Sequence, residues 1–332
     1  IVNAQQVNIG AAKTVPELLR TTAGIQIQAR PNAGGNEDLS VKLRGHDSRH
    51  YTVLVDGVPQ SMSGVMGGGY VNWNAIPLGM VERIEITKGS KSAAHGQTEG
   101  GIINIITKKS ANAGELQFTA GSNDRRQYNF NYGLQNAKLS LNMYANKAEQ
   151  DAYLRNSDYD NEQAGFNLSY ELNNTDTLRV KYDHQQLKRG LVVQNVPGSA
   201  DFDSRYPATP IGDSFANYQG KLPGDGSYTK IFRNNFNVSW NSNRTNGSDS
   251  ITYWKNYEKQ REHNVIGGQV IFDRYNVTDK SDGLMYKGST KLNPKHYLGY
   301  GIDYKRLRYG YGWYNVKIGG GVLGIGTSAF SN

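Results

Sequence analysis

Apolar and polar residues alternate strictly along successive stretches of the chain between about residues 114 and 309. One stretch, "QYNFNYGLQ", places Tyr128, Phe130, Tyr132 and Leu134 on one face and Asn129 with other polar residues on the opposite face. Because side chains of a strand point to opposite faces at every second residue, this pattern predicts strands with one apolar and one polar face. Nine strands are expected, at roughly 114–122, 126–135, 138–148, 163–173, 176–187, 229–243, 248–261, 282–292 and 295–309.

The connections between these strands indicate a membrane barrel. Short turns such as "LQNAK" and "LNNTD" alternate with long loops at 149–161, 188–227 and 260–281. This order gathers the short turns at one end and the long loops at the other, as in barrels with periplasmic turns and extracellular loops. A soluble antiparallel sandwich with one wet face gives the same alternation and is the alternative.

Residues 1–110 follow a different pattern and predict a compact α+β unit. Thr14 and Glu17 predict a capping box at the start of one short helix, which Gly24 ends. Strands are expected at 25–30, 40–45, 51–59, 81–89 and 101–109. Asp56 and Gly57 predict a tight turn within the third of these.

The strand count does not close a barrel by itself. Single-chain bacterial barrels use even numbers of strands, and only wide barrels of about 22 strands hold a plug in their lumen. Residues 111–332 supply about nine strands and end in "GWYNVKIGGGVLGIGTSAFSN", which is interpreted as an unfinished loop. Either the α+β unit lies outside a small barrel, or the chain is the first part of a larger barrel of about 22 strands; we expect the second.

The amino-acid composition limits the classes of function that the chain can have. The chain of 332 residues contains no Cys, which excludes disulfides and thiolate chemistry, and its formal net charge is +8. Lys and Arg are scattered through the strands rather than gathered on one helix or arm, so nucleic acid is not an expected partner. A basic barrel lumen, or contact with anionic lipid, explains the positive charge at least as well as nucleic-acid binding does. No signal peptide is visible at Ile1.

The N-terminal third resembles the plug domain of TonB-dependent outer-membrane receptors. The resemblance lies in "VKLRGHDSRHYTVLVDGVP", followed by "IPLGMVERIEITKGSKSAAHGQTEGGIINIITK", and in "TVPELLRTTAGIQI" at 14–27. It implies an α+β plug inside a transmembrane β-barrel of the bacterial outer membrane. It further implies TonB as the energy-coupling partner, outer-membrane lipid around the barrel, and active uptake of a bulky ligand. No TonB box is visible before Ile1, so coupling is implied by the resemblance alone.

The resemblance also implies a lock between plug and barrel. Arg44 matches one of the plug arginines that pair with barrel glutamates, and Lys88 stands where the family has the other; Glu82 is assigned to the same lock. Lysine lacks the bidentate fork of arginine, so a weaker lock is expected.

Substrate residues are expected in two loops. The stretch 60–79 carries a glycine run beside large apolar side chains that are suited to a ligand floor, namely Met62, Met66, Tyr70 and Trp73. The alternative is that Tyr70 and Trp73 pack the plug against the barrel wall. The loop 188–227 is too long for a simple connection and offers Arg189, Arg205, Tyr206 and Tyr218.

No constellation predicts catalysis, a metal or a cofactor. His46 and His50 lie between two strand candidates and indicate a polar turn, and the aspartates of 188–227 lack the spacing of a calcium loop. Ser92, His95 and Glu99 lack a nucleophile elbow. The expected function is ferric siderophore uptake. Cobalamin, haem, an oligosaccharide, or a non-transporting surface receptor or adhesin barrel are the alternatives.

Overall fold

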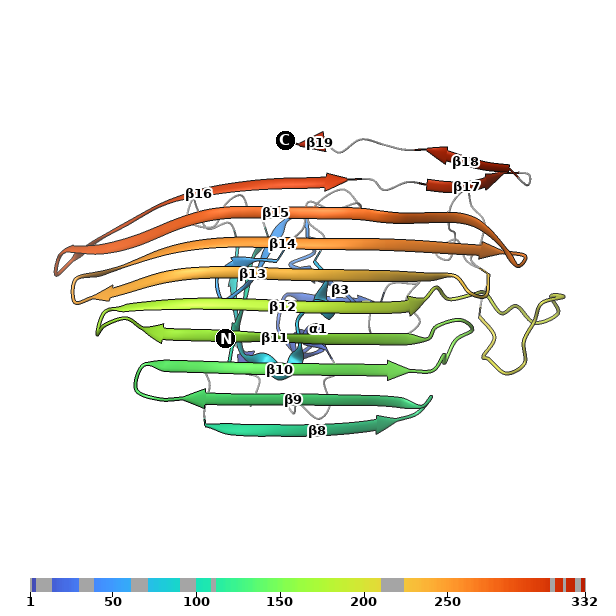
Figure 1. Ribbon diagram of the computed structural model, residues 1–332, viewed down its shortest axis with the longest axis horizontal. Coiled ribbons are helices and arrows are strands. Elements are labelled where there is room, and N and C mark those ends of the chain that lie inside the picture. Colours follow the sequence, from blue (N-terminus) through green and yellow to red (C-terminus); the bar gives the residue numbers. More distant parts are fainter. Residues whose placement is uncertain are drawn as a thin grey trace.

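The computed structural model of the protein describes residues 2–3, 14–29, 39–60, 71–89, 100–108, 112–209, 224–310, 314–318, 321–325 and 330–331. The chain forms a small α+β domain and one large antiparallel sheet (Figure 1). The small domain, in blue and cyan, lies behind the middle strands of the sheet, and side-chain hydrogen bonds join the two.

The N-terminal domain combines one short helix with two small sheets. Its five-stranded sheet has the order β1-β6-β7-β4-β5, and β2 pairs with β3 in a separate hairpin. Strands β4 and β7 run parallel, while the other pairs are antiparallel. The elements are α1 (Val15–Leu19), β1 (Val2–Asn3), β2 (Ile25–Ala29), β3 (Leu39–Leu43), β4 (Tyr51–Val55), β5 (Val58–Pro59), β6 (Val81–Lys88) and β7 (Gly101–Thr107), with 3-10 turns η1 (Trp73–Ala75) and η2 (Leu78–Met80).

Thr14 is the N-cap of helix α1 as expected, but the predicted capping box is wrong. The Thr14 hydroxyl makes no capping hydrogen bond, and it is buried with no partner among the described residues. Pro16 in the first turn sets a helical φ without needing a donor, and burial of Leu18 and Leu19, both 0% exposed, holds the helix against the domain. Tertiary packing therefore replaces the cap.

The β4–β5 connection is a two-residue hairpin turn. Asp56 has a φ of 50° and Gly57 a φ of 84°, which is the left-handed pair that a type I′ turn requires. The Gly57 amide donates to Asn104 Oδ1 at 3.1 Å, which ties the turn to β7. The turn therefore holds the Asp56 carboxylate at a fixed point on the edge of the domain.

The core of the N-terminal domain is formed mainly by branched aliphatic side chains. Val53, Ile84, Ile103 and Ile105 are 0 % exposed and come from the three central strands. Tyr144 of the large sheet also packs into this cluster. The small domain thus has its own core and a contact to the sheet.

The large sheet contains the nine strands at the positions that the alternation predicts. They follow in chain order, each antiparallel to the next (Figure 1). Their bounds are β8 (Ala113–Gly121), β9 (Arg125–Gln135), β10 (Leu139–Gln150), β11 (Tyr159–Glu171), β12 (Asp176–Gly190), β13 (Tyr228–Arg244), β14 (Gly247–Ile266), β15 (Gln269–Asn293) and β16 (His296–Gly310). Three short strands follow, β17 (Tyr314–Ile318), β18 (Gly321–Ile325) and β19 (Phe330–Ser331).

Two loop predictions are wrong. The expected loop at 260–281 is a continuation of β14 and β15, which meet in a turn at Gly267 and Gly268 with φ values of 56° and 73°. The segment expected as an unfinished loop contains β17 and β18, which pair with each other. Along β14 from Lys255 to Glu262 most residues on both faces are polar, so the alternation that predicts strands fades there.

The two faces of the large sheet differ. The face away from the N-terminal domain is apolar and aromatic, with Leu116 at 80% and Ile302 at 71% exposure. The face toward the domain is polar and contains buried Lys181, Gln185 and Arg233. Within the described ranges, no helix has both the length and the apolar character needed to cross a membrane.

Candidate functional site at the interface between the two domains

Asp56 is the hub of one polar cluster between the N-terminal domain and the sheet. Its Oδ1 accepts from the Thr107 amide at 3.0 Å, and its Oδ2 accepts from the Thr107 hydroxyl at 2.8 Å. Asn167 of β11 donates to the same hydroxyl oxygen at 3.2 Å. The tight turn and β7 therefore present one carboxylate, already oriented by two hydrogen bonds, to the inner face of the sheet.

Lys181 of β12 joins this carboxylate to the sheet. Its Nζ lies 3.5 Å from Asp56 Oδ2 and 3.9 Å from Asp183 Oδ2, and its side chain is 5% exposed. The Tyr144 hydroxyl donates to the other oxygen of Asp183. One buried ammonium thus bridges an aspartate of each domain, which fixes their separation.

A second cluster surrounds the residues that follow the turn. Arg233 of β13 donates from Nη2 to Gln60 Oε1 at 3.2 Å and from Nε to Asn235 Oδ1 at 3.2 Å. Asn256 of β14 donates to the Pro59 carbonyl at 3.4 Å. Arg233 and Asn256 are each 1% exposed, so these bonds form away from bulk solvent.

A third cluster lies at Asn72. Its Nδ2 donates to Gln185 Oε1 at 3.1 Å, and Gln185 donates onward to Asn161 Oδ1 at 2.9 Å. Asn72 is 1% exposed and Gln185 2% exposed. This chain of amides extends the contact across β12 and β11.

Some buried polar atoms of these clusters have no hydrogen-bond partner among the described residues. They are Asn72 Oδ1, Arg233 Nη1 and Glu258 Oε2. A buried unsatisfied polar atom costs about 1–3 kcal/mol, and that cost is regained when water reaches it. The interface is therefore held by directional bonds, yet parts of it gain hydration when the two surfaces separate.

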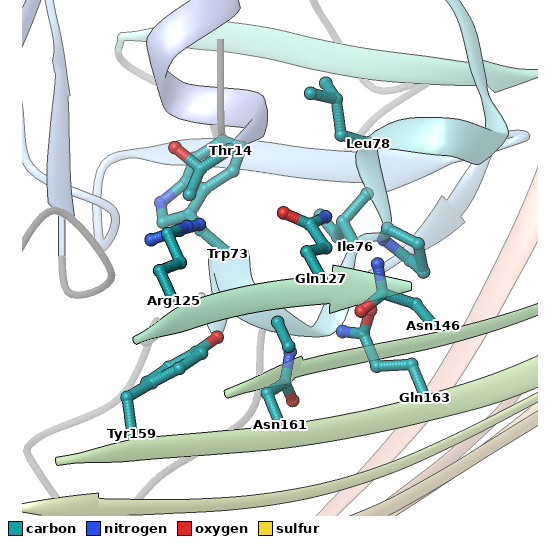
Figure 2. A pocket seen from close by; sticks show the side chains of 12 residues that line it. Thr14, Trp73, Ile76, Leu78, Arg125, Gln127, Asn146, Tyr159, Asn161 and Gln163 are labelled. Carbon is teal, nitrogen blue, oxygen red and sulfur yellow. The ribbon is translucent and has the colours of Figure 1, made fainter. Parts of the chain in front are cut away.

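A small cavity of ≈ 40 Å³ lies between η1 and strands β9 to β11 (Figure 2). Trp73, Ile76 and Leu78 line it from the N-terminal domain, and Arg125 and Tyr159 line it from the sheet. Amides of the sheet, Gln127, Asn146, Asn161 and Gln163, complete its wall. The cavity has room for little more than ordered water.

The substrate residues expected in the first loop fall into two groups. Met62, Met66 and Tyr70 lie outside the described residues. Trp73 is 6% exposed and belongs to the core of the N-terminal domain, where it also faces the cavity. Packing between domain and sheet accounts for Trp73 without a ligand; its contact with a substrate stays a prediction.

The second loop is partly described and is internally bonded. Asn195, 0% exposed, donates to the carbonyl groups of Asp203 and Tyr206 and accepts from the Asp203 amide. Arg205 donates to Asp203, and its side-chain and backbone bonds lower the pKa of that carboxyl to about 2. The Arg205 guanidinium also lies 5.8 Å from the Tyr206 ring. Both residues are engaged within the loop, and their substrate role stays a prediction.

Arg189 and Tyr218 complete the expected substrate set. Arg189 lies near the loop end of β12, paired in register with Tyr159 and Thr229, and in the strand alternation it shares the inward face with Lys181. Tyr218 lies outside the described residues. Arg189 is thus placed on the lumen face close to the loops, where its role stays a prediction.

A neighbouring loop ties this long loop down. Arg155 binds Asp225 with an Nη2–Oδ2 distance of 2.6 Å. Asn156 donates to the carbonyl groups of Leu191 and Ser227, both at 2.7 Å. The β10–β11 loop therefore holds both ends of the 191–227 connection together.

The residues expected in the plug–barrel lock lie on the N-terminal domain. The side chains of Arg44 and Lys88 lie beside Gly24, and Arg44 also reaches Gly89. Glu82 pairs with Arg83 at 2.8 Å. Their pairing with barrel glutamates stays a prediction. The contacts described above through Asp56, Gln60 and Asn72 were not predicted. The sequence signal that could have indicated these contacts is the run of polar residues at alternate, inward positions of β12 and β13.

Within the described part of the chain, no three metal-ligating side chains gather. The polar groups of the interface are amides, hydroxyls and paired charges. Such groups bind, orient and release a surface through hydrogen bonds. The interface is therefore suited to a separable contact between two domains.

Comparison with known proteins agrees with this arrangement. The profile of the TonB-dependent Receptor Plug Domain family matches residues 1–102. The vitamin B12 transporter BtuB of Vibrio cholerae is 40% identical over 109 residues, which are 32% of this chain and 17% of that protein.

Solved structures show the same fold over nearly the whole chain. The ferric enterobactin receptor PfeA of Pseudomonas aeruginosa, as a mutant, has a TM-score of 0.67 at 17% identity, covering 93% of this chain and 49% of that one. The copper transporter OprC has a TM-score of 0.70 at 14% identity, covering 94% and 46%. The chain thus spans about half the length of these solved receptors.

An α+β domain seated by polar contacts on the inner face of an antiparallel sheet with an apolar outer face defines a plugged membrane barrel. Residues 1–102 match the plug domain of TonB-dependent receptors, and the chain as a whole shares the fold of the solved receptors. This confirms the predicted fold class, an α+β plug followed by part of a β-barrel.

Proposed function

We propose that the protein takes part in TonB-dependent active transport across the bacterial outer membrane. The observation that supports this proposal is the polar plug–barrel interface, in which Lys181 and Arg233 bind plug groups. Separating apolar surfaces costs about 25 cal/mol per Å², whereas separated amides and charges recover hydrogen bonds to water. Such an interface suits a plug that is moved by an external force and then returns.

We propose a ferric siderophore as the substrate. Similar structures include the ferric enterobactin receptor and the ferripyoverdine receptor of P. aeruginosa, the latter with a TM-score of 0.67 and 16% identity over 91% of this chain and 41% of that one. The net charge of +8 favours an anionic chelate. Cobalamin is the second candidate, because the chain is 40% identical over 109 residues to a vitamin B12 transporter.

Uptake in cells tests both candidates. Strains with and without the intact gene are grown under iron limitation with single ferric chelates, and uptake of labelled iron and labelled cobalamin is measured with and without TonB. Iron uptake that requires both the gene and TonB supports the siderophore proposal. Gene-dependent uptake of cobalamin alone supports the second candidate. A surface receptor or adhesin role follows if no uptake depends on the gene.

A further inference from the structure

The inner face of the large sheet is hollowed near one end of its strands. At this end, on the left in Figure 1, short turns join β11 to β12, β13 to β14 and β15 to β16. A cavity of ≈ 460 Å³ lies there on strands β12 to β15. We call it the short-turn hollow, and its lining includes Arg179, Asn241, Ser248, Ser250, Lys287 and Ser289. Small-molecule sites have volumes of about 300–1,000 Å³, so the hollow is large enough for such a ligand.

The strand alternation places these side chains on the plug side of the sheet. Arg179 comes two positions before Lys181 on β12, and Lys181 binds the plug. Ser250 comes six positions before Asn256 on β14, and Asn256 binds the plug as well. Lys287 is the register partner of Ser250 on β15. Because side chains at even spacing along a strand share a face, the hollow opens toward the lumen.

Small hydroxyl side chains form the floor of the hollow. Ser248 and Ser289 lie opposite each other on neighbouring strands, with 3.0 Å between their Oγ atoms. Farther along the same face of β14 the wall is filled by the large side chain of Trp254, which is 1% exposed. The change from tryptophan to serine recesses the wall and offers hydroxyl groups as hydrogen-bond donors.

Arg179 and Lys287 lie on opposite sides of this floor. Their strands, β12 and β15, are separated by β13 and β14, so the two backbones are roughly 14 Å apart at ~4.8 Å per strand. Arg179 is exposed, and it forms no ion pair or hydrogen bond with the residues that the structure describes. Two long cations on either side of a hydroxyl floor are suited to an anion that reaches from one to the other.

The acids near the hollow do not neutralise Arg179. Asp249 borders the hollow, but its carboxylate accepts hydrogen bonds from two tyrosine hydroxyls, at 2.8 Å and 2.9 Å, and pairs with Arg244. Asp303 of β16 attracts Lys287. The charge of Arg179 is therefore available to a ligand.

We propose that the short-turn hollow binds an anionic, oxygen-rich metal chelate as it leaves the lumen. The inference rests on the proposed function, which makes such a chelate the cargo and the short-turn end its exit. The next inward cation of β12, Lys181, is held by Asp56 while the plug is seated. Once the plug moves, Lys181 and Arg179 follow each other along the exit path. A small oxyanion such as inorganic phosphate has the same chemistry but cannot reach both sides of the hollow.

The test uses the full-length receptor in detergent, with a trifluoromethyl label on Gly299→Cys that is read by fluorine NMR. Gly299 is the register partner of Ser289 and has open space around it, and the 332 residues contain no native Cys. The probes are the anionic gallium tris-catecholate complex, the neutral gallium tris-hydroxamate complex and inorganic phosphate. Because a fluorine shift responds to its immediate surroundings, the label reports binding in the hollow and not at the long loops.

Two variants of equal charge change separate the hollow from general electrostatics. The test variant is Arg179→Gln/Lys287→Gln, and the matched control, Lys138→Gln/Lys295→Gln, removes two exposed lysines at the same end of the sheet. Lys295 follows Asn293, the last residue of β15, which is roughly 20 Å along the strand from Lys287 at ~3.4 Å per residue and so beyond the screening length. The swap Arg179→Lys/Lys287→Arg keeps both charges and shows whether a loss comes from charge or from folding.

The wild type is expected to bind the anionic complex about tenfold more tightly than the neutral complex or phosphate. The test variant should bind it about tenfold more weakly than the wild type, while the control and the swap stay within about threefold. No shift in the wild type, equal binding of the neutral complex or of phosphate, or a loss in the control or the swap as large as in the test variant overturns the proposal.

Chelate uptake by cells separates this inference from the proposed function. Gene-dependent uptake without any shift of the label removes the hollow as a binding site and leaves the transport proposal in place. A shift of the label without gene-dependent uptake of any chelate removes the transport proposal and the exit role with it.

Discussion

Breaking the Lys181–Asp56 contact tests whether the polar interface seats the plug. The two charges lie 3.5 Å apart, with side chains 5% and 27% exposed. At an effective dielectric constant of ~20 their attraction is about 5 kcal/mol before desolvation is subtracted. Desolvation of the lysine offsets much of this, so the net coupling is expected to be about 1–2 kcal/mol.

The two single substitutions are expected to differ. Asp56→Asn leaves a buried ammonium with Asp183 at 3.9 Å as its remaining acid, and we expect a loss of about 2–3 kcal/mol. Lys181→Met leaves Asp56 partly solvated and still bound to Thr107, so about 1–2 kcal/mol is expected. The double variant should lose less than the sum of both.

Urea unfolding of the plug within the full-length receptor measures these values, followed by tryptophan fluorescence and analysed as a double-mutant cycle. The control cycle uses Arg306 and Asp282 on the outer face, a pair at 3.0 Å with side chains 47% and 14% exposed. That more exposed pair should couple by less than about 1 kcal/mol and should not affect the plug. A Lys181–Asp56 coupling below about 0.5 kcal/mol refutes the seating role.

Three further changes test other parts of the argument. Tyr144→Phe removes a hydroxyl donor on a residue that is 7% exposed, and it should lower plug stability to urea by about 0.5–1.5 kcal/mol. Gly57→Ala places a Cβ atom at a φ of 84° with no other atom within 4 Å, so the expected loss of about 1–2 kcal/mol of plug stability should come from backbone strain alone. Gly299→Ala, which also has no atom within 4 Å, should leave the stability unchanged in the same assay. The pKa of Asp203 is lowered from 3.8 to about 2, so the stabilisation that its carboxylate gives to the loop is complete above pH 3.8 and is lost as the pH falls through 2. The Arg205 amide donates to this carboxylate, so its normalised hydrogen exchange should show the transition in the wild type. The variant Asp203→Asn should not show it.

The strands of the large sheet could be predicted because their signal is local. A lipid-facing side chain every second residue gives alternation that is visible within one strand, as along β9 and β11. The end of β14 and the start of β15 were missed, because most residues of β14 from Lys255 to Glu262 are polar on both faces and Gly267-Gly268 were assigned to a loop. The strand signal in the sequence is therefore a signal of one-sided burial rather than of strand formation.

The interface could not be predicted from the sequence, because its contacts are distant in the chain. Asp56 was identified for its turn, yet its partner Lys181 follows 125 positions later. Arg233 reaches Gln60 across 173 positions. Short patterns predict such a residue's conformation but not its partner. Thr14 shows the opposite failure: its local sequence pattern predicts a capping hydrogen bond, but its hydroxyl makes none, because packing of the helix determines the structure there.

The distribution of apolar residues indicates which surfaces stay closed. Branched aliphatic side chains such as Ile103 and Ile105 are buried inside the plug, and large apolar residues such as Leu116 and Ile302 lie on the outer sheet face. The inner sheet face carries amides and paired charges beside buried Leu187, Ile231 and Trp254, and Tyr144 packs into the plug core. Water cannot replace apolar contacts, but it can replace the hydrogen bonds that amide groups lose when two surfaces separate. We therefore expect a force applied to the plug to meet its weakest resistance at the interface, so that the plug separates from the strands before either structure unfolds.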